Sequence, residues 1–212
     1  MRRLPVYLVL DTSGSMSGEP IEAVKNGVQV LISTLRQDPY ALETAFLSLI
    51  TFDSDARQLV PLTDLSSFQM PELKAAGGTS LGAALQTVAD SINREVAKST
   101  IDVKGDWKPL VFLMTDGIPT DQWQNGLNAF QNSKIGITVA CAAGNGADVN
   151  LLKQITNTVV SLDTADAATI KAFFKWVSAS VSTGSQKVES GDKEVAGLNE
   201  LPPPPPEVNI VV

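Results

Sequence analysis

Residues 6–15 read VYLVLDTSGS, in which five apolar residues run directly into a polar loop. A continuous apolar run of this length predicts a strand that is buried on both faces, as in a parallel sheet covered by helices. Asp11, Ser13 and Ser15 follow where that strand ends. Open parallel sheets bind ligands beyond the carboxyl ends of their strands. The stretch therefore predicts both a fold class and the edge of the sheet that carries a functional site.

The rest of the chain alternates between strand-like apolar runs and segments with helical spacing. Pro20 stands near the first position of a helix, and apolar residues recur at helical intervals from Ile21 to Leu35. The alternation predicts an α/β fold, a doubly wound and mostly parallel six-stranded sheet with one antiparallel edge strand and helices on both faces. The expected strands are 6–10, 44–52, 57–62, 110–114, 136–142 and 159–162; the expected helices are 20–35, 81–96, 122–132, 149–155 and 165–181.

Two further polar loops belong to the same predicted edge. The segment 77–80, Gly-Gly-Thr-Ser, precedes a predicted helix, and the segment 115–117, Thr-Asp-Gly, follows a predicted central strand. Together with the first loop they offer two carboxylates and three hydroxyls, but no imidazole or thiolate. Such an all-oxygen set suits a hard divalent cation, and Mg²⁺ in particular takes near-octahedral oxygen coordination at about 2.0–2.1 Å. The candidate metal ligands are Asp11, Ser13, Ser15, Thr79 and Asp116.

These five residues, in chain order, resemble the metal-ion-dependent adhesion site (MIDAS) of von Willebrand factor type A (vWA) domains. That family is marked by an Asp-x-Ser-x-Ser loop, a distant Thr and a distant Asp, and the resemblance covers residues 5–181. It implies a vWA, Rossmann-like fold and a bound Mg²⁺ or Mn²⁺. The two serines and often the threonine would touch the cation, and the aspartates would act directly or through water. A carboxylate from a partner protein would complete the coordination.

Within the vWA family, the chain most resembles compact bacterial TerY-like proteins, which are associated with tellurium resistance and stress operons. This similarity implies a Mg²⁺-dependent protein–protein interaction module that serves as a scaffold in a bacterial tellurite-resistance or stress-response complex. It also implies a kinase or a phosphatase among the partners. We expect the isolated chain to be a monomer.

Composition bears on the other function classes. A formal charge of −7 with dispersed basic residues argues against nucleic-acid binding. The absence of histidine removes the Ser-His-Asp and Cys-His catalytic arrangements and disfavours zinc sites. The single cysteine, Cys141, lies in an apolar run and is expected to be buried, which fits a reducing compartment. The apolar stretch 6–10 is too short for a secretory signal or a membrane span. We therefore expect a soluble, cytoplasmic protein without a membrane partner.

An enzyme is the main alternative, either a Mg²⁺-dependent phosphatase or a phospho-switch that uses Asp11. Phosphatases of the haloacid dehalogenase type carry a second aspartate two residues after the nucleophile, where this chain has Ser13. They also need a lysine near the later acidic motif, where this chain continues Gly-Ile-Pro over 117–119. A receiver-like switch would need clustered acids near Asp11 and a lysine at a later strand end, and the sequence offers neither. We predict that the chain is not an enzyme.

Single site residues also have purely structural interpretations. Asp11 and Thr79 each suit a helix cap or a turn, and serines are common in loops. Four other acids are available near the same edge and could support the site, although solvated loop carboxylates are their simpler interpretation. These acids are Asp53, Asp55, Asp64 and Asp121. The five-part combination in chain order is what favours a metal site.

The composition changes after residue 182. Polar residues dominate 183–200 and predict a mobile linker, because they offer little apolar surface to offset backbone entropy. Five prolines at 202–206 predict an extended stretch, and an apolar end follows over 207–212. We therefore divide the chain into a vWA domain over 1–182 and a flexible linker with a proline-rich tail over 183–212. The tail either binds a partner, which the sequence favours, or packs back on its own domain.

Overall fold

The structure, a computed structural model, describes residues 2–191, 195 and 197–211 of the chain. Within these residues one sheet has seven strands in the order β3-β2-β1-β4-β5-β6-β7. The strands are β1 (Leu4–Asp11), β2 (Ala45–Phe52), β3 (Ala56–Asp64), β4 (Leu110–Thr115), β5 (Ile137–Ala143), β6 (Val159–Leu162) and β7 (Asn209–Val211).

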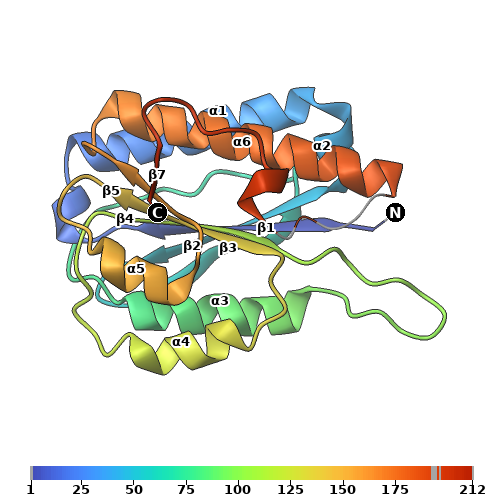
Figure 1. Ribbon diagram of the computed structural model, residues 1–212, viewed down its shortest axis with the longest axis horizontal. Coiled ribbons are helices and arrows are strands. Elements are labelled where there is room, and N and C mark those ends of the chain that lie inside the picture. Colours follow the sequence, from blue (N-terminus) through green and yellow to red (C-terminus); the bar gives the residue numbers. More distant parts are fainter. Residues whose placement is uncertain (1, 192–194, 196, 212) are drawn as a thin grey trace.

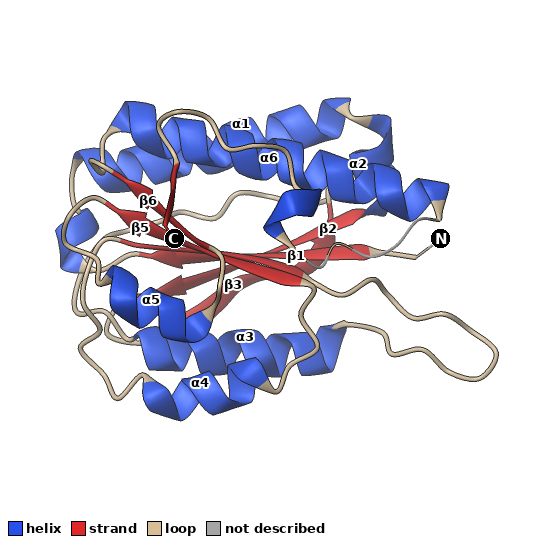
Figure 2. Ribbon diagram, viewed as in Figure 1, coloured by secondary structure: helices blue, strands red, loops and turns tan. Residues whose placement is uncertain are grey.

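Helices cover both faces of this sheet (Figure 1). The helices α1, α2 and α6 lie on one face, and α3, α4 and α5 lie on the other (Figure 2). The predicted α/β class, with a mostly parallel sheet between helical layers, is confirmed. The helices are α1 (Glu19–Gln37), α2 (Pro39–Thr44), α3 (Leu81–Glu95), α4 (Gln124–Gln131), α5 (Val149–Ile155) and α6 (Ala167–Ser190), with short 3-10 turns η1 (Gly14–Met16) and η2 (Leu198–Glu200).

The order of the strands reverses around β1. Strand β2 pairs with one side of β1 and β4 with the other, both in parallel, and β5 and β6 continue the parallel series. The gap between the carboxyl ends of β1 and β4 is therefore a topological switch point, where such sheets bind ligands. Strand β3 is the expected antiparallel edge. The predicted strand number was wrong, because β7 adds a second antiparallel edge beside β6.

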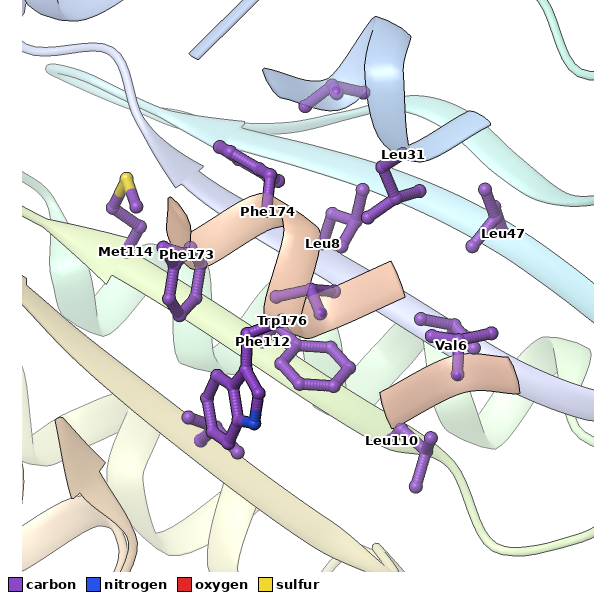
Figure 3. Close-up of a cluster of buried hydrophobic side chains, with 14 of the residues drawn as sticks. Val6, Leu8, Leu31, Leu47, Leu110, Phe112, Met114, Phe173, Phe174 and Trp176 are labelled. Atoms are coloured by element: carbon purple, nitrogen blue, oxygen red, sulfur yellow. The ribbon is translucent and has the colours of Figure 1, made fainter. Parts of the chain in front are cut away.

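The larger part of the core lies between the sheet and the layer formed by α1 and α6. Figure 3 shows Leu8, Phe112 and Met114 from the sheet gathered with Phe173 and Phe174 from α6. All five side chains are buried. The aromatic residues of the last helix therefore pack against the sheet.

The opposite face of the sheet packs against α3, α4 and α5. Trp123 belongs to this second cluster, and Trp107 belongs to the first one. Both indoles are buried, so both tryptophans serve the core and neither forms an exposed rim around the candidate site. Cys141 is buried as predicted, and its burial raises the pKa of the thiol. No helix in the described part of the chain has the length and apolar character needed to span a bilayer.

The last helix extends beyond the expected end of the domain. Helix α6 runs to Ser190 and ends at Gly191, whose φ of 72° lies in the left-handed region that favours glycine. The predicted boundary at residue 182 thus falls inside a helix, and residues 183–190 are helical where a linker was expected. The polar composition is misleading because Ser185 and Val188 are buried, and the Thr183 hydroxyl donates to the Ala179 carbonyl one turn earlier. Gly184 adds a close contact with Leu4 of β1.

The segment after α6 crosses back over the domain to β7 (Figure 1). Its apolar residues Val195, Leu201 and Val208 are buried and belong to the main core. The indole N–H of Trp176 donates to the carbonyl of Pro202 at 2.8 Å. These contacts fit the alternative in which the tail packs on its own domain. The expected linker residues 192–194 and 196 lie outside the described part of the chain.

Candidate metal centre

The two carboxylates of the candidate site come from neighbouring parallel strands. Asp11 is the last residue of β1, and Asp116 follows directly after β4. Leu10 of β1 pairs with Met114 of β4, so Asp116 follows one residue beyond the level of Asp11, on the same carboxyl edge. The topology therefore brings together two acids that are 105 positions apart in the numbering.

Three of the predicted ligands already form a chain of short oxygen contacts. The hydroxyl oxygens of Ser13 and Ser15 are 3.0 Å apart, and Ser15 Oγ donates to Asp116 Oδ1 at 2.7 Å. Neighbouring ligands of an octahedral cation with bonds of about 2.0–2.1 Å lie about 2.9 Å from one another. The observed separations are those of ordinary hydroxyl hydrogen bonds, and they are also compatible with adjacent ligands of a small octahedral cation.

Thr79 lies beside the same oxygens. A methyl group placed on Gly117 would be 3.5 Å from Thr79 Oγ1 and 4.0 Å from Ser15 Oγ, so the two hydroxyls border one small space next to Gly117. Thr79 is itself buried. The structure thus brings its hydroxyl, from the loop before α3, to the loops that carry Ser15 and Asp116.

Asp11 differs from Asp116 in its surroundings. It is completely buried, its Oδ1 accepts from the Ser13 N–H at 2.8 Å, and its Oδ2 accepts from Thr115 Oγ1 at 2.6 Å. Burial raises the pKa of the Asp11 carboxyl, and the charge of Asp116 raises it further, whereas hydrogen bonds from Ser13 and Thr115 act in the opposite direction. Two carboxylates in one site favour a bound cation, since it would relieve their mutual repulsion. Thr115 is a site residue that the sequence-based reasoning missed.

The three loops are joined by hydrogen bonds of their own. The N–H of Gly14 donates to the carbonyl of Gly77 at 3.0 Å. Thr120 binds the backbone of Thr79 twice, because its hydroxyl accepts from the Thr79 N–H and its own N–H donates to the Thr79 carbonyl, both at 2.9 Å. A Cβ atom at Gly78 would lie 2.7 Å from the Thr120 hydroxyl, so glycine is required there. Protein contacts alone therefore hold the site in place.

The additional acids have structural partners. The carboxylate of Asp121 accepts from the N–H groups of Gly82 and Ala83 at 3.1 and 3.0 Å, which caps the first turn of α3. Asp53 Oδ1 lies 3.6 Å from Nη2 of the Arg57 guanidinium, with which it forms an ion pair. Across the described residues, no three His, Cys, Asp or Glu side chains cluster in a way that could hold a metal ion. The candidate centre consequently depends on hydroxyl oxygens beside its two carboxylates.

Comparison with known proteins agrees with this architecture. The family model of the von Willebrand factor type A domain matches residues 6–175. An uncharacterized protein of Synechocystis sp. is 36% identical over 123 residues, which are 55% of this chain and 26% of the relative. This chain therefore spans about a quarter of that relative's length.

Solved structures show the same fold. The von Willebrand factor type A protein from Catenulispora acidiphila has a TM-score of 0.65 at 19% identity, covering 86% of this chain and 43% of that one. The pilus adhesin SpaC from Lactobacillus rhamnosus GG has a TM-score of 0.67 at 16% identity, covering 86% and 31%. Proximal thread matrix protein 1 from the mussel byssus, with a zinc-occupied MIDAS motif, has a TM-score of 0.60 at 16% identity, covering 87% and 46%. At these identities the likeness concerns the fold alone.

Proposed function

Because this chain belongs to the von Willebrand factor type A family, we propose that it is a divalent-cation-dependent protein-interaction module. The cation, Mg²⁺ or Mn²⁺, is held by the five oxygen-bearing residues at the carboxyl edge of the sheet. A bound cation would supply a positive charge that a partner's carboxylate can bind. The proposed ligands are Asp11, Ser13, Ser15, Thr79 and Asp116.

The observation that carries this proposal is the chain of contacts from Ser13 through Ser15 to Asp116. Its oxygen separations of 3.0 and 2.7 Å are compatible with adjacent ligands around a small octahedral cation. Asp11 holds the loop that carries both serines, because its Oδ1 accepts a hydrogen bond from the N–H of Ser13. Because the hydroxyls are neutral ligands, the two aspartates would just balance a doubly charged cation, whose exposed side can still attract an acidic partner.

The same geometry argues against the phosphatase alternative. A nucleophilic Asp11 would need a free, accessible carboxylate oxygen, but its side chain is buried and both oxygens already accept hydrogen bonds, from Ser13 and Thr115. The chain also has no histidine that could act as a general base. We therefore propose a role in binding and none in catalysis.

The resemblance to TerY-like proteins supports a more specific proposal. In it, the module acts in the cytoplasm of a bacterium as a scaffold of a tellurite-resistance or stress-response complex, with a kinase or phosphatase among its partners. An exposed Asp or Glu side chain of the partner would bind the cation at the metal site.

Affinity capture from a bacterial lysate tests the proposed function. Wild-type chain, Asp116→Ala and Asp55→Ala are compared, each with Mg²⁺ and with excess chelator. Asp55 is a matched control because it is an exposed acid in a loop at the same edge, outside the ligand set. A partner retained by wild type and Asp55→Ala, and lost with chelator or Asp116→Ala, supports the proposal. Retention of the same partners by all samples contradicts it.

A further inference from the structure

A cavity lies at the opposite edge of the sheet from the candidate metal centre. Its volume is about 570 Å³, within the range of small-molecule sites. Its walls come from the end of α3 with the loop after it and from the segments that lead into β1, β4 and β5, so it lies at the amino ends of these parallel strands. In Figure 1 the long loop between α3 and β4 extends away from the body at this end, near the N-terminus.

The charge of this cavity is opposite to that of the whole chain. The chain carries a formal charge of −7, yet the cavity is lined by four cationic side chains and one acid. The charge of the acid, Asp106, is already compensated, because its carboxylate accepts hydrogen bonds from Arg3 Nε at 2.9 Å and from the Ala97 N–H at 2.7 Å. The four cationic residues are Arg2, Lys98, Lys108 and Lys134.

Two of these cations have no acidic partner in the described part of the chain. Lys98 belongs to the loop after α3, and Lys134 to the turn between α4 and β5. Neither ammonium group forms an ion pair with a carboxylate of the described residues. Like charges gathered around a hollow raise the local concentration of anions. Both lysines are exposed at the cavity, so both ammonium groups can attract an anion that enters it.

The rest of the lining suits an organic group. Ile92 and Val96 contribute apolar surface next to the cations, and the buried Trp107 lies behind this lining. The guanidinium carbon of Arg2 lies 5.4 Å from the centre of the Trp107 ring, which fixes one cation against this wall. The buried indole N–H of Trp107 has no hydrogen-bond acceptor among the described residues, an uncommon state for a buried donor.

We propose that this cavity binds a phosphate ester, with the phosphate at the cationic side chains and the organic group against Ile92 and Val96, next to the buried Trp107. A phosphate monoester carries a charge of about −1.5 to −2 at neutral pH, which matches several cations better than a single carboxylate does. Arginine and lysine are the side chains that recognise phosphate oxygens. This site is independent of the metal centre, so the chain would present a carboxylate-binding edge and a phosphate-binding edge at opposite ends.

Titration of the ¹⁵N-labelled chain with phenyl phosphate tests this proposal, with the indole N–H signals as reporters. We expect a saturable shift of the Trp107 signal and none of the Trp176 signal, because Trp176 does not line the cavity and its N–H already donates to Pro202. The double variant Lys98→Ala/Lys134→Ala should bind at least about tenfold more weakly. The control Lys25→Ala/Lys175→Ala removes the same charge from α1 and α6 and should bind as wild type does.

Further probes separate the sources of the phosphate group. Phenyl phosphate binding assigns a soluble ester, and binding only to vesicles that contain phosphatidic acid assigns a lipid headgroup; either supports the proposal if Lys98→Ala/Lys134→Ala weakens it. Benzoate that binds as tightly as phenyl phosphate would overturn it. So would the absence of binding to both phosphate probes, or an equal loss of affinity in both lysine pairs.

Discussion

The substitution Leu201→Ala tests whether the segment after α6 is part of the folded domain. Leu201 is 7% exposed and belongs to the main hydrophobic core, although it directly precedes the proline run. Replacing a buried leucine by alanine costs about 2–5 kcal/mol of unfolding free energy, depending on how far the surroundings relax. Leu201 lies in a surface-crossing segment that can relax, so we expect about 2–3 kcal/mol, at the low end of that range.

Thermal unfolding followed by circular dichroism measures this effect. For a chain of this size, about 1 kcal/mol lowers Tm by about 2–4 °C, so Leu201→Ala should lower it by roughly 4–12 °C. Ile210→Ala is the matched control from the same segment, because Ile210 is 48% exposed and its truncation should change the unfolding free energy by no more than about 0.5 kcal/mol. Equal Tm values for the two variants would show that the tail does not pack on the domain, and would favour the interpretation that it binds a partner.

Three other predictions follow from single contacts. Gly27→Ala would place a methyl group 2.3 Å from Cδ2 of the buried Phe174, so overpacking should lower the free energy of unfolding in urea by about 1–3 kcal/mol. Thr115→Val removes the hydroxyl that donates to Asp11 Oδ2, and calorimetry should show weaker Mg²⁺ binding, whereas unchanged affinity would show that this hydrogen bond does not position Asp11. Burial raises the pKa of the Cys141 thiol, so a thiol reagent at pH 8 should label it only in denaturant; rapid labelling of native protein would contradict its burial.

The sequence predicted the parts of this protein that depend on simple periodicity and on topology. The apolar run 6–10 is a buried strand because parallel strands between two helical layers have no polar face. Asp11 and Asp116 meet because the carboxyl ends of parallel strands share one edge. These two rules place the candidate metal centre without any knowledge of side-chain contacts.

What the sequence did not predict depends on particular contacts. Thr115 donates to Asp11 only because the register of β4 turns its hydroxyl toward β1, and no spacing rule gives that direction. Ser178 and Ser180 of α6 appear polar in the sequence, but their hydroxyls bind the helix backbone and can be buried. Strand β7 follows five prolines, and its pairing with β6 depends on the path of the preceding segment over Trp176.

The central claim is that one divalent cation binds at the carboxyl edge of the sheet. Titration calorimetry with Mn²⁺ on wild type, Asp11→Ala and Asp55→Ala measures this most directly. We expect one saturable site in wild type and in Asp55→Ala, and its loss in Asp11→Ala. We also expect Mn²⁺ at about 100 times the dissociation constant to stabilise wild type by about 2.7 kcal/mol. Equal Mn²⁺ affinity in wild type and Asp11→Ala, or no binding to wild type, would contradict a cation site at this edge.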